Sequence, residues 1–129
     1  MKNEFVEKNL IVKLTIEFSL DVIRYCESLE EKRKFVLSNQ LLKSGTSIGA
    51  NIHEAQNAES KLDFIHKMKI AAKEADETHY WLTLCKYAEN YPPCDNLINE
   101  LTSISKVLNK IIATSKRKSP LIYLLSFII

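Results

Sequence analysis

The chain of 129 residues contains only two glycines, Gly45 and Gly49, and both lie in the stretch 40–55. That stretch otherwise has the pattern of a long helix, in which each interior glycine costs about 1 kcal/mol relative to alanine. Residues four apart share one helical face, so the two missing side chains leave adjacent gaps. Because neither position has a Cβ, another backbone can approach closely there. We therefore expect these glycines to pack tightly against a neighbouring helix.

Apolar residues elsewhere recur at steps of three and four, the spacing of amphipathic helices. Four helices are predicted: residues 9–29, residues 35–57, a third capped by Ser60 and ended by Pro92 and Pro93, and a fourth capped by Asp95 or Asn96. The stripes expected to face the core are Ile11, Leu14, Phe18, Val22, Tyr25 and Leu29; Leu37, Leu41, Gly45, Ile48, Ile52 and Ala55; Phe64, Met68, Ala71, Ala75, Thr78, Leu82 and Cys85; and Leu97, Leu101, Ile104, Leu108 and Ile111. Short connections favour antiparallel neighbours, so the predicted fold class is all-α, an up-down-up-down antiparallel four-helix bundle. In that arrangement the small residues of the third stripe are expected to face the glycines of the second helix.

The first predicted helix carries a second apolar face, formed by Val12, Ile16, Leu20 and Ile23. A helix that is apolar on two sides must be covered on two sides. The bundle covers one of them, so we expect the second to meet another subunit. This pattern predicts a homo-oligomer.

The domain organisation predicted is one bundle domain over residues 1–118, followed by an apolar tail over residues 119–129. The nine residues 121–129 are strongly apolar but fall short of the roughly 20 that a spanning helix needs. Packing against protein is the expectation for this tail, in a groove of the bundle or on a neighbouring subunit. Insertion into a membrane surface is the alternative.

Net charge bears on the kind of partner, and cysteine usage bears on the compartment. The formal net charge of +2 comes from 18 Lys and Arg against 16 Asp and Glu, too small an excess to indicate a nucleic-acid partner by itself. Cys26, Cys85 and Cys94 are odd in number and show no ligand spacing. The N-terminal stretch also has no apolar run of signal-peptide length, so reduced thiols in a cytoplasm are expected.

Four-helix bundles often hold two metals through Glu-x-x-His on two helices and a carboxylate from each of the others. The nearest matches are Asp63 with His66 and Asp76 with His79. The two pairs are 13 residues apart on one predicted helix, so they point toward roughly opposite faces. We therefore predict no metal site and no cofactor.

The potential nucleophiles or bases of the second and third predicted helices are Ser44, Ser47, His53 and Cys85. Nothing in the sequence assembles a base and an orienting group around any of them. The segment GTSIG is also not a phosphate loop, because no Lys-Ser/Thr pair follows it and no strand precedes it. We predict no catalytic residues and a protein that is not an enzyme.

Polar residues lie on the flanks of two predicted stripes, with Lys43, Asn51 and Glu54 on the second helix and Glu74 and Glu77 on the third. Two readings are open: a solvated flank with pairs four residues apart, or charge-assisted bonds between helices or subunits. Trp81, on the third predicted helix, is expected to lie in the core or at a subunit contact. The candidate packing and assembly residues are therefore Ser44, Gly45, Gly49, Asn51, Glu54, Glu74 and Trp81.

Basic residues cluster twice, and the candidates for nucleic-acid contact are Lys32, Arg33 and Lys34, and Lys116, Arg117 and Lys118. In an up-down-up-down bundle these clusters lie at opposite ends, so one monomer offers no continuous basic face. In a ring of subunits each cluster would repeat around a rim and provide a field that can hold phosphates. Plainly solvated helix ends are the simpler alternative.

The run QLLKSGTSIGANIHEAQNAESKLDFIHKMKIAAKEADETHYWLTL, residues 40–84, resembles the four-helix-bundle proteins named for the 23S ribosomal RNA intervening sequence, sometimes called S23 ribosomal proteins. The matching positions include Gln40, Ser44, Gly45, Gly49, Asn51, Glu54, Phe64, Lys67, Glu74, Glu77 and Trp81. The resemblance covers about residues 10–108. Lys43 stands where arginine is usual, which keeps the charge and loses bidentate bonding; the tail from about Ser119 is outside the family pattern.

The resemblance implies a homo-oligomer, in the form of a pentameric ring with a central channel, and no enzymatic activity. A similar barrel is formed by the accessory protein of diversity-generating retroelements, which engages reverse transcriptase and nucleic acid. Our first hypothesis is therefore an oligomeric binding or scaffolding module for RNA or a ribonucleoprotein. The second is an assembly protein that binds a protein partner and makes no nucleic-acid contact.

Overall fold

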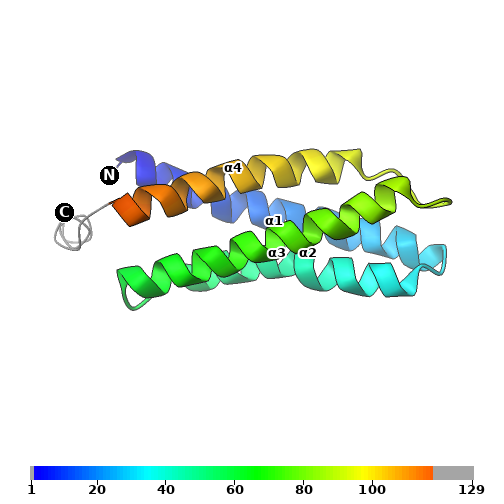
Figure 1. Cartoon of the computed structure of the whole chain (residues 1–129), viewed down its shortest axis with the longest axis horizontal. Helices are drawn as coiled ribbons and strands as arrows, with labels where there is room; N and C mark the ends of the chain where they lie inside the picture. Colours follow the sequence, from blue (N-terminus) through cyan, green and yellow to red (C-terminus); the bar gives the residue numbers. More distant parts are fainter. Residues whose placement is uncertain (1, 118–129) are drawn as a thin grey trace.

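The computed structural model of the protein describes the backbone of residues 2–117 and the side chains of residues 10–117. It contains four α-helices, α1 (Lys2–Glu31), α2 (Phe35–Ala55), α3 (Lys61–Tyr87) and α4 (Asp95–Arg117), and no strand within this part of the chain. Figure 1 shows the helices lying lengthwise beside one another, with the α1–α2 turn and the α3–α4 connection at one end and the α2–α3 turn at the other. The packed pairs are α1–α2, α2–α3, α3–α4 and α1–α4.

The core follows the predicted periodicity closely. All seven residues of the predicted α3 stripe and all five of the predicted α4 stripe are buried. The first two helices differ in detail, because Leu14 and Leu37 are only partly buried and polar side chains lie deeper than expected. Thr15, Ser38 and Ser44 are each at most 1% exposed. Small polar residues thus lie in the core where α2 meets its neighbours.

Helix ends are set by caps and turns. The hydroxyl of Ser60 accepts a hydrogen bond from the backbone N–H of Asp63 at 3.0 Å, so the predicted N-cap of α3 is confirmed. At the other end α3 stops at Tyr87, before the two prolines, and α4 already begins at Asp95. Arg33 turns the chain between α1 and α2 with a positive φ of 63°.

Two further predictions concern a membrane span and the apolar tail, and the structure describes only the residues that bear on the first. No helix within residues 2–117 is long and apolar enough to cross a bilayer. The apolar tail over residues 119–129 lies outside the described residues, as does Lys118.

Candidate functional site

The glycines lie at the α1–α2 junction. A Cβ built on Gly45 would be 3.0 Å from Val22 Cγ1, and one on Gly49 would be 3.2 Å from Thr15 Cβ. Both glycines thus pack tightly against a neighbouring helix, through side chains of that helix and not through its backbone. The expected partner is wrong, because the nearest atoms belong to side chains of α1 and not to the small residues of α3.

Ser44, next to the first glycine, points the other way and meets α3. Its hydroxyl oxygen is 3.0 Å from Thr78 Oγ1, which is also 2.7 Å from the carbonyl oxygen of Glu74. A hydroxyl donates one hydrogen bond, so this geometry is satisfied when Thr78 donates to the Glu74 carbonyl and Ser44 donates to Thr78. Both side chains are fully buried, and the pair links α2 to α3 in the core.

The polar flank of α2 and α3 forms one face of the bundle. Lys67 Nζ lies 3.6 Å from Glu54 Oε2 and joins the two helices by an exposed ion pair. Burial raises the pKa of the Glu74 carboxyl, the charge of Glu77 raises it further, and Lys43 lowers it. Contact between the helices is thus present on this flank. Asn51, by contrast, donates only to the Ser47 carbonyl of its own helix, at 2.8 Å.

Trp81 is partly buried against the core on α3. Its ring makes an edge-to-face contact with Tyr80, with 5.1 Å between centroids. The indole N–H is buried and has no acceptor among the described residues. Tyr80 itself is 56% exposed, so this aromatic pair spans from the core to the surface.

An apolar stripe runs along the outer side of α1. We name Ile16, Leu20 and Ile23 the outer stripe; they are 54%, 49% and 40% exposed. Their spacing of four and three residues places them on one helical face, opposite the buried face that carries Phe18 and Val22. The outer stripe contains three of the four residues of the second apolar face predicted from the sequence, and nothing within the described chain covers it. The fourth, Val12, is partly buried and packs against the core.

The basic clusters lie at opposite ends of the bundle (Figure 1). Lys32 and Arg33 are exposed at the α1–α2 turn. Lys34 is partly buried, and its ammonium lies 5.0 Å from the centre of the Tyr91 ring, a cation–π contact with the α3–α4 connection. Lys32 and Arg33 can therefore contact a polyanion, whereas Lys34 also joins the α1–α2 turn to the α3–α4 connection.

At the other end, Lys116 and Arg117 are exposed. Lys69 of α3 lies close to Lys116 and lowers the pKa of Lys116, because a hydrogen bond with Lys69 favours the neutral amine and because the two positive charges repel each other. Sequence reasoning missed Lys69, because only packing brings α3 alongside the end of α4. It extends this basic cluster across two helices.

The candidate nucleophiles are not assembled into a site. Ser44 is occupied in the core, Ser47 bonds to the Lys43 carbonyl at 2.6 Å, and His53 is exposed. Burial raises the pKa of the Cys85 thiol to about 11, and a thiol is a weaker nucleophile than its thiolate. No group of three His, Cys, Asp or Glu side chains arranged to hold a metal is found within residues 10–117.

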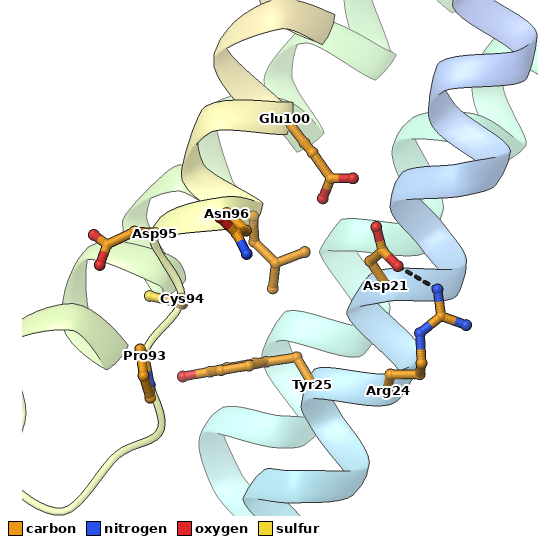
Figure 2. Close-up of a pocket in the computed structure, with 9 residues that line it drawn as sticks. Asp21, Arg24, Tyr25, Pro93, Cys94, Asp95, Asn96 and Glu100 are labelled. Atoms are coloured by element: carbon orange, nitrogen blue, oxygen red, sulfur yellow. Dashed lines mark hydrogen bonds and ion pairs between the residues drawn. The ribbon is translucent and has the colours of Figure 1, made fainter.

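A pocket of about 760 Å³ opens between α1 and the start of α4, and sequence reasoning missed it. Figure 2 shows Asp21 and Glu100 facing each other across it, with Arg24 bonded to the Asp21 carboxylate. The phenol of Tyr25 closes one side by donating to the Pro92 carbonyl at 2.7 Å.

Two carboxyls of this pocket titrate differently. Burial first, and then the hydrogen bond and charge of Asp21, together raise the pKa of Glu100 to about 7. The pKa of Asp21 is lowered, first by its hydrogen bond with Glu100 and then by Arg24. One carboxyl is thus held ionised, while its neighbour is about half protonated at neutral pH and mostly protonated below it.

A family model described as 23S rRNA-intervening sequence protein matches residues 7–110 of this chain. Among solved structures, the chain is similar to a protein of unknown function from the S23 ribosomal protein family of Bacteroides thetaiotaomicron VPI-5482. The two are 42% identical, the match covers 83% of this chain and 98% of the other, and the TM-score is 0.79. No curated protein matches the chain.

Proposed function

The chain belongs to the 23S rRNA-intervening sequence protein family, and from that premise we propose that it is a cytoplasmic, non-enzymatic binding or scaffolding module. In this proposal the antiparallel up-down-up-down bundle assembles into a homo-oligomeric ring of five subunits. The ring contacts RNA or a ribonucleoprotein through its basic ends.

The outer stripe of α1 carries the proposal of assembly. Ile16, Leu20 and Ile23 are each at least 40% exposed, although they lie side by side on one helix. Single exposed apolar residues are normal on a protein surface, but a continuous apolar row favours burial against a partner. A second copy of this chain would remove the row from water.

A closed ring needs two different complementary surfaces on each subunit, because its interfaces are head to tail. The outer stripe supplies one of them. Further exposed apolar side chains lie along α3, with Leu62 (79% exposed) near its start and Tyr80 (56%) and Tyr87 (77%) toward its end. We propose α3 as the side that receives the outer stripe of the next subunit.

The basic clusters support the choice of RNA. Each repeats once per subunit, so a ring would carry Lys32 and Arg33 around one rim and Lys116 and Arg117 around the other. Summed over the ring, these charges attract phosphates more strongly than the net charge of +2 of a single chain indicates.

The test is the salt dependence of binding to a base-paired RNA hairpin. Replacing Lys32, Arg33 and Lys34 by glutamine should make the slope of log affinity against log salt shallower, because fewer counterions are released. The matched control replaces Lys13, Lys73 and Lys106, which are exposed on the helix sides, and removes the same charge. Equal slopes for the two triple variants would contradict contact through this rim.

A purely structural assembly protein with a protein partner is the second candidate. The near-neutral net charge and the outer stripe favour it, since both fit an apolar protein contact without a polyanion. No binding of the hairpin at low salt would support this function over the first. Stoichiometric metal in elemental analysis of the purified protein would contradict the non-enzymatic assignment of either.

A further inference from the structure

We infer that Asp21 of α1 and Glu100 of α4 share one proton, and that this carboxyl pair makes the α1–α4 junction a pH-sensitive contact. The inference concerns the bundle itself and holds whether the protein binds RNA, a protein or neither. Its basis is the placement of the two side chains across the pocket in Figure 2, where Glu100 reaches from α4 toward Asp21.

Arg24 is the cation nearest to the two carboxyls, and it already pairs with Asp21. Arg24 lies one turn after Asp21 on α1 and bonds to that carboxylate. Glu100 makes no ion pair with any of the described side chains. Two carboxyls therefore face each other, and the one guanidinium nearby is bound to Asp21 on the side away from Glu100. A proton is the remaining group that can join the two carboxyls by a hydrogen bond.

The charged groups around Glu100 are also mostly acidic or already paired. From α1 it is faced by Glu17 and Asp21, which are acidic, and by Arg24. At the start of its own helix, Asp95 lies at the edge of the pocket, where Lys86 of α3 pairs with it at 3.4 Å. An ionised Glu100 would bring a further negative charge to a site whose cations are already paired.

Protonation changes the character of the junction. When Glu100 is protonated, its O–H donates to the Asp21 carboxylate, which in turn accepts from Arg24, so one chain of hydrogen bonds joins α4 to α1. When Glu100 loses its proton, that bond is replaced by repulsion between two carboxylates. The pocket then admits water and counterions more readily, and the start of α4 is held less firmly against α1.

The sign of the pH dependence follows from the two states. In the unfolded chain Glu100 titrates near its ordinary value of 4.5, whereas the pKa is about 7 in the folded protein. Between these values the folded state binds more protons, so stability falls as pH rises through this range. The lowered pKa of Asp21 acts in the opposite direction, but only below its ordinary value of 3.8.

The test compares thermal unfolding at pH 5.5 and pH 8, at one protein concentration and ionic strength, for the wild type and for Glu100→Gln. The wild type should lose several degrees of melting temperature at pH 8. Glutamine donates a hydrogen bond to Asp21 at either pH, so most of that difference should disappear in the variant. Glu31→Gln, which removes an exposed carboxyl at the end of α1, should keep the wild-type difference.

A direct readout avoids dependence on the variant's folding. Carbon-13 NMR of the side-chain carboxyls in the intact wild-type protein should give Glu100 a midpoint close to pH 7. A midpoint near 4.5, or a pH difference in melting temperature that Glu100→Gln leaves unchanged, would overturn the inference. Because neither readout involves RNA, failure here is distinguishable from failure of the proposed function.

Discussion

α1 makes two very different contacts with its neighbours. Toward α2 it meets the glycines, and a Cβ added at Gly45 would come within 3.0 Å of Val22. Toward α4 it lines a pocket, where Tyr25 bonds to a backbone carbonyl and the Asp21–Glu100 pair spans the gap. The first contact is fixed by shape, and the second by hydrogen bonds and a proton.

The difference indicates which conditions each contact responds to. Van der Waals packing of uncharged groups has no direct dependence on pH, so the α1–α2 junction should hold equally well in acid and in base. The α1–α4 junction depends on which carboxyls are ionised, and its strength varies with pH. A single bundle thus has one rigid junction and one adjustable junction on the same helix.

The largest effect is expected from filling the α1–α2 junction. Gly45→Leu should lower the free energy of unfolding by about 3 kcal/mol, because the new side chain cannot fit against Val22 without displacing α1. Urea denaturation at pH 5.5 and pH 8 should show the same loss at both. Ala50→Leu, at an exposed position of α2, is the control and should be nearly neutral. Wild-type stability of Gly45→Leu would contradict the close-approach interpretation.

A second variant can sharpen that result. Adding Val22→Ala to Gly45→Leu makes space on α1 where the leucine is expected to clash. The double variant should be less destabilised than the sum of the two single changes, since residues in contact are not additive. Strict additivity would mean that the leucine is accommodated elsewhere.

A smaller effect is expected at the α1–α4 junction from Tyr25→Phe. This change removes the hydrogen bond to the Pro92 carbonyl and should cost about 1 kcal/mol. Burial raises the pKa of Tyr25 above its ordinary value, so the phenol is neutral at pH 5.5 and pH 8, and the loss should be equal at both. Tyr87→Phe, at an exposed position, serves as the control in the same denaturation experiment. A loss confined to one pH would assign the pH response to the phenol instead of the carboxyls.

The smallest effect is expected on the α2–α3 flank. Lys67→Ala breaks the exposed ion pair with Glu54 and should change the free energy of unfolding by less than about 0.5 kcal/mol. Chemical denaturation of Lys67→Ala and Glu54→Ala should give similar small values. A loss well above about 1 kcal/mol would indicate that this flank is covered in an assembly, where the pair is shielded from water.

Most of the fold could be predicted because it depends on a local repeat. A helical period of about 3.6 residues determines which side chains share a face, so the seams through Met68 and Leu101 were identified from spacing alone. The cap at Ser60 was also predictable, because it depends on residues three positions apart. Information of this kind is contained within a few turns of chain.

The partner of the glycines and the pocket depend on which helix packs against which face. Local sequence spacing does not determine that arrangement. Two glycines indicate a close approach but not its direction, so α3 was expected where α1 is found. Asp21 and Glu100 are far apart in the chain, and neither has a local signal that it faces the other. The pocket therefore became visible only in the folded structure.

The outer stripe of α1 connects these contacts to function, and the native mass of the protein tests it most directly. Light scattering on the purified chain should give a mass several times the 14.9 kDa of one subunit. Leu20→Glu, in the centre of the outer stripe, should lower that mass while the helical content stays unchanged. Leu62→Glu on α3 tests the proposed receiving surface in the same way. A wild-type protein that is monomeric at micromolar concentration would contradict assembly through the outer stripe.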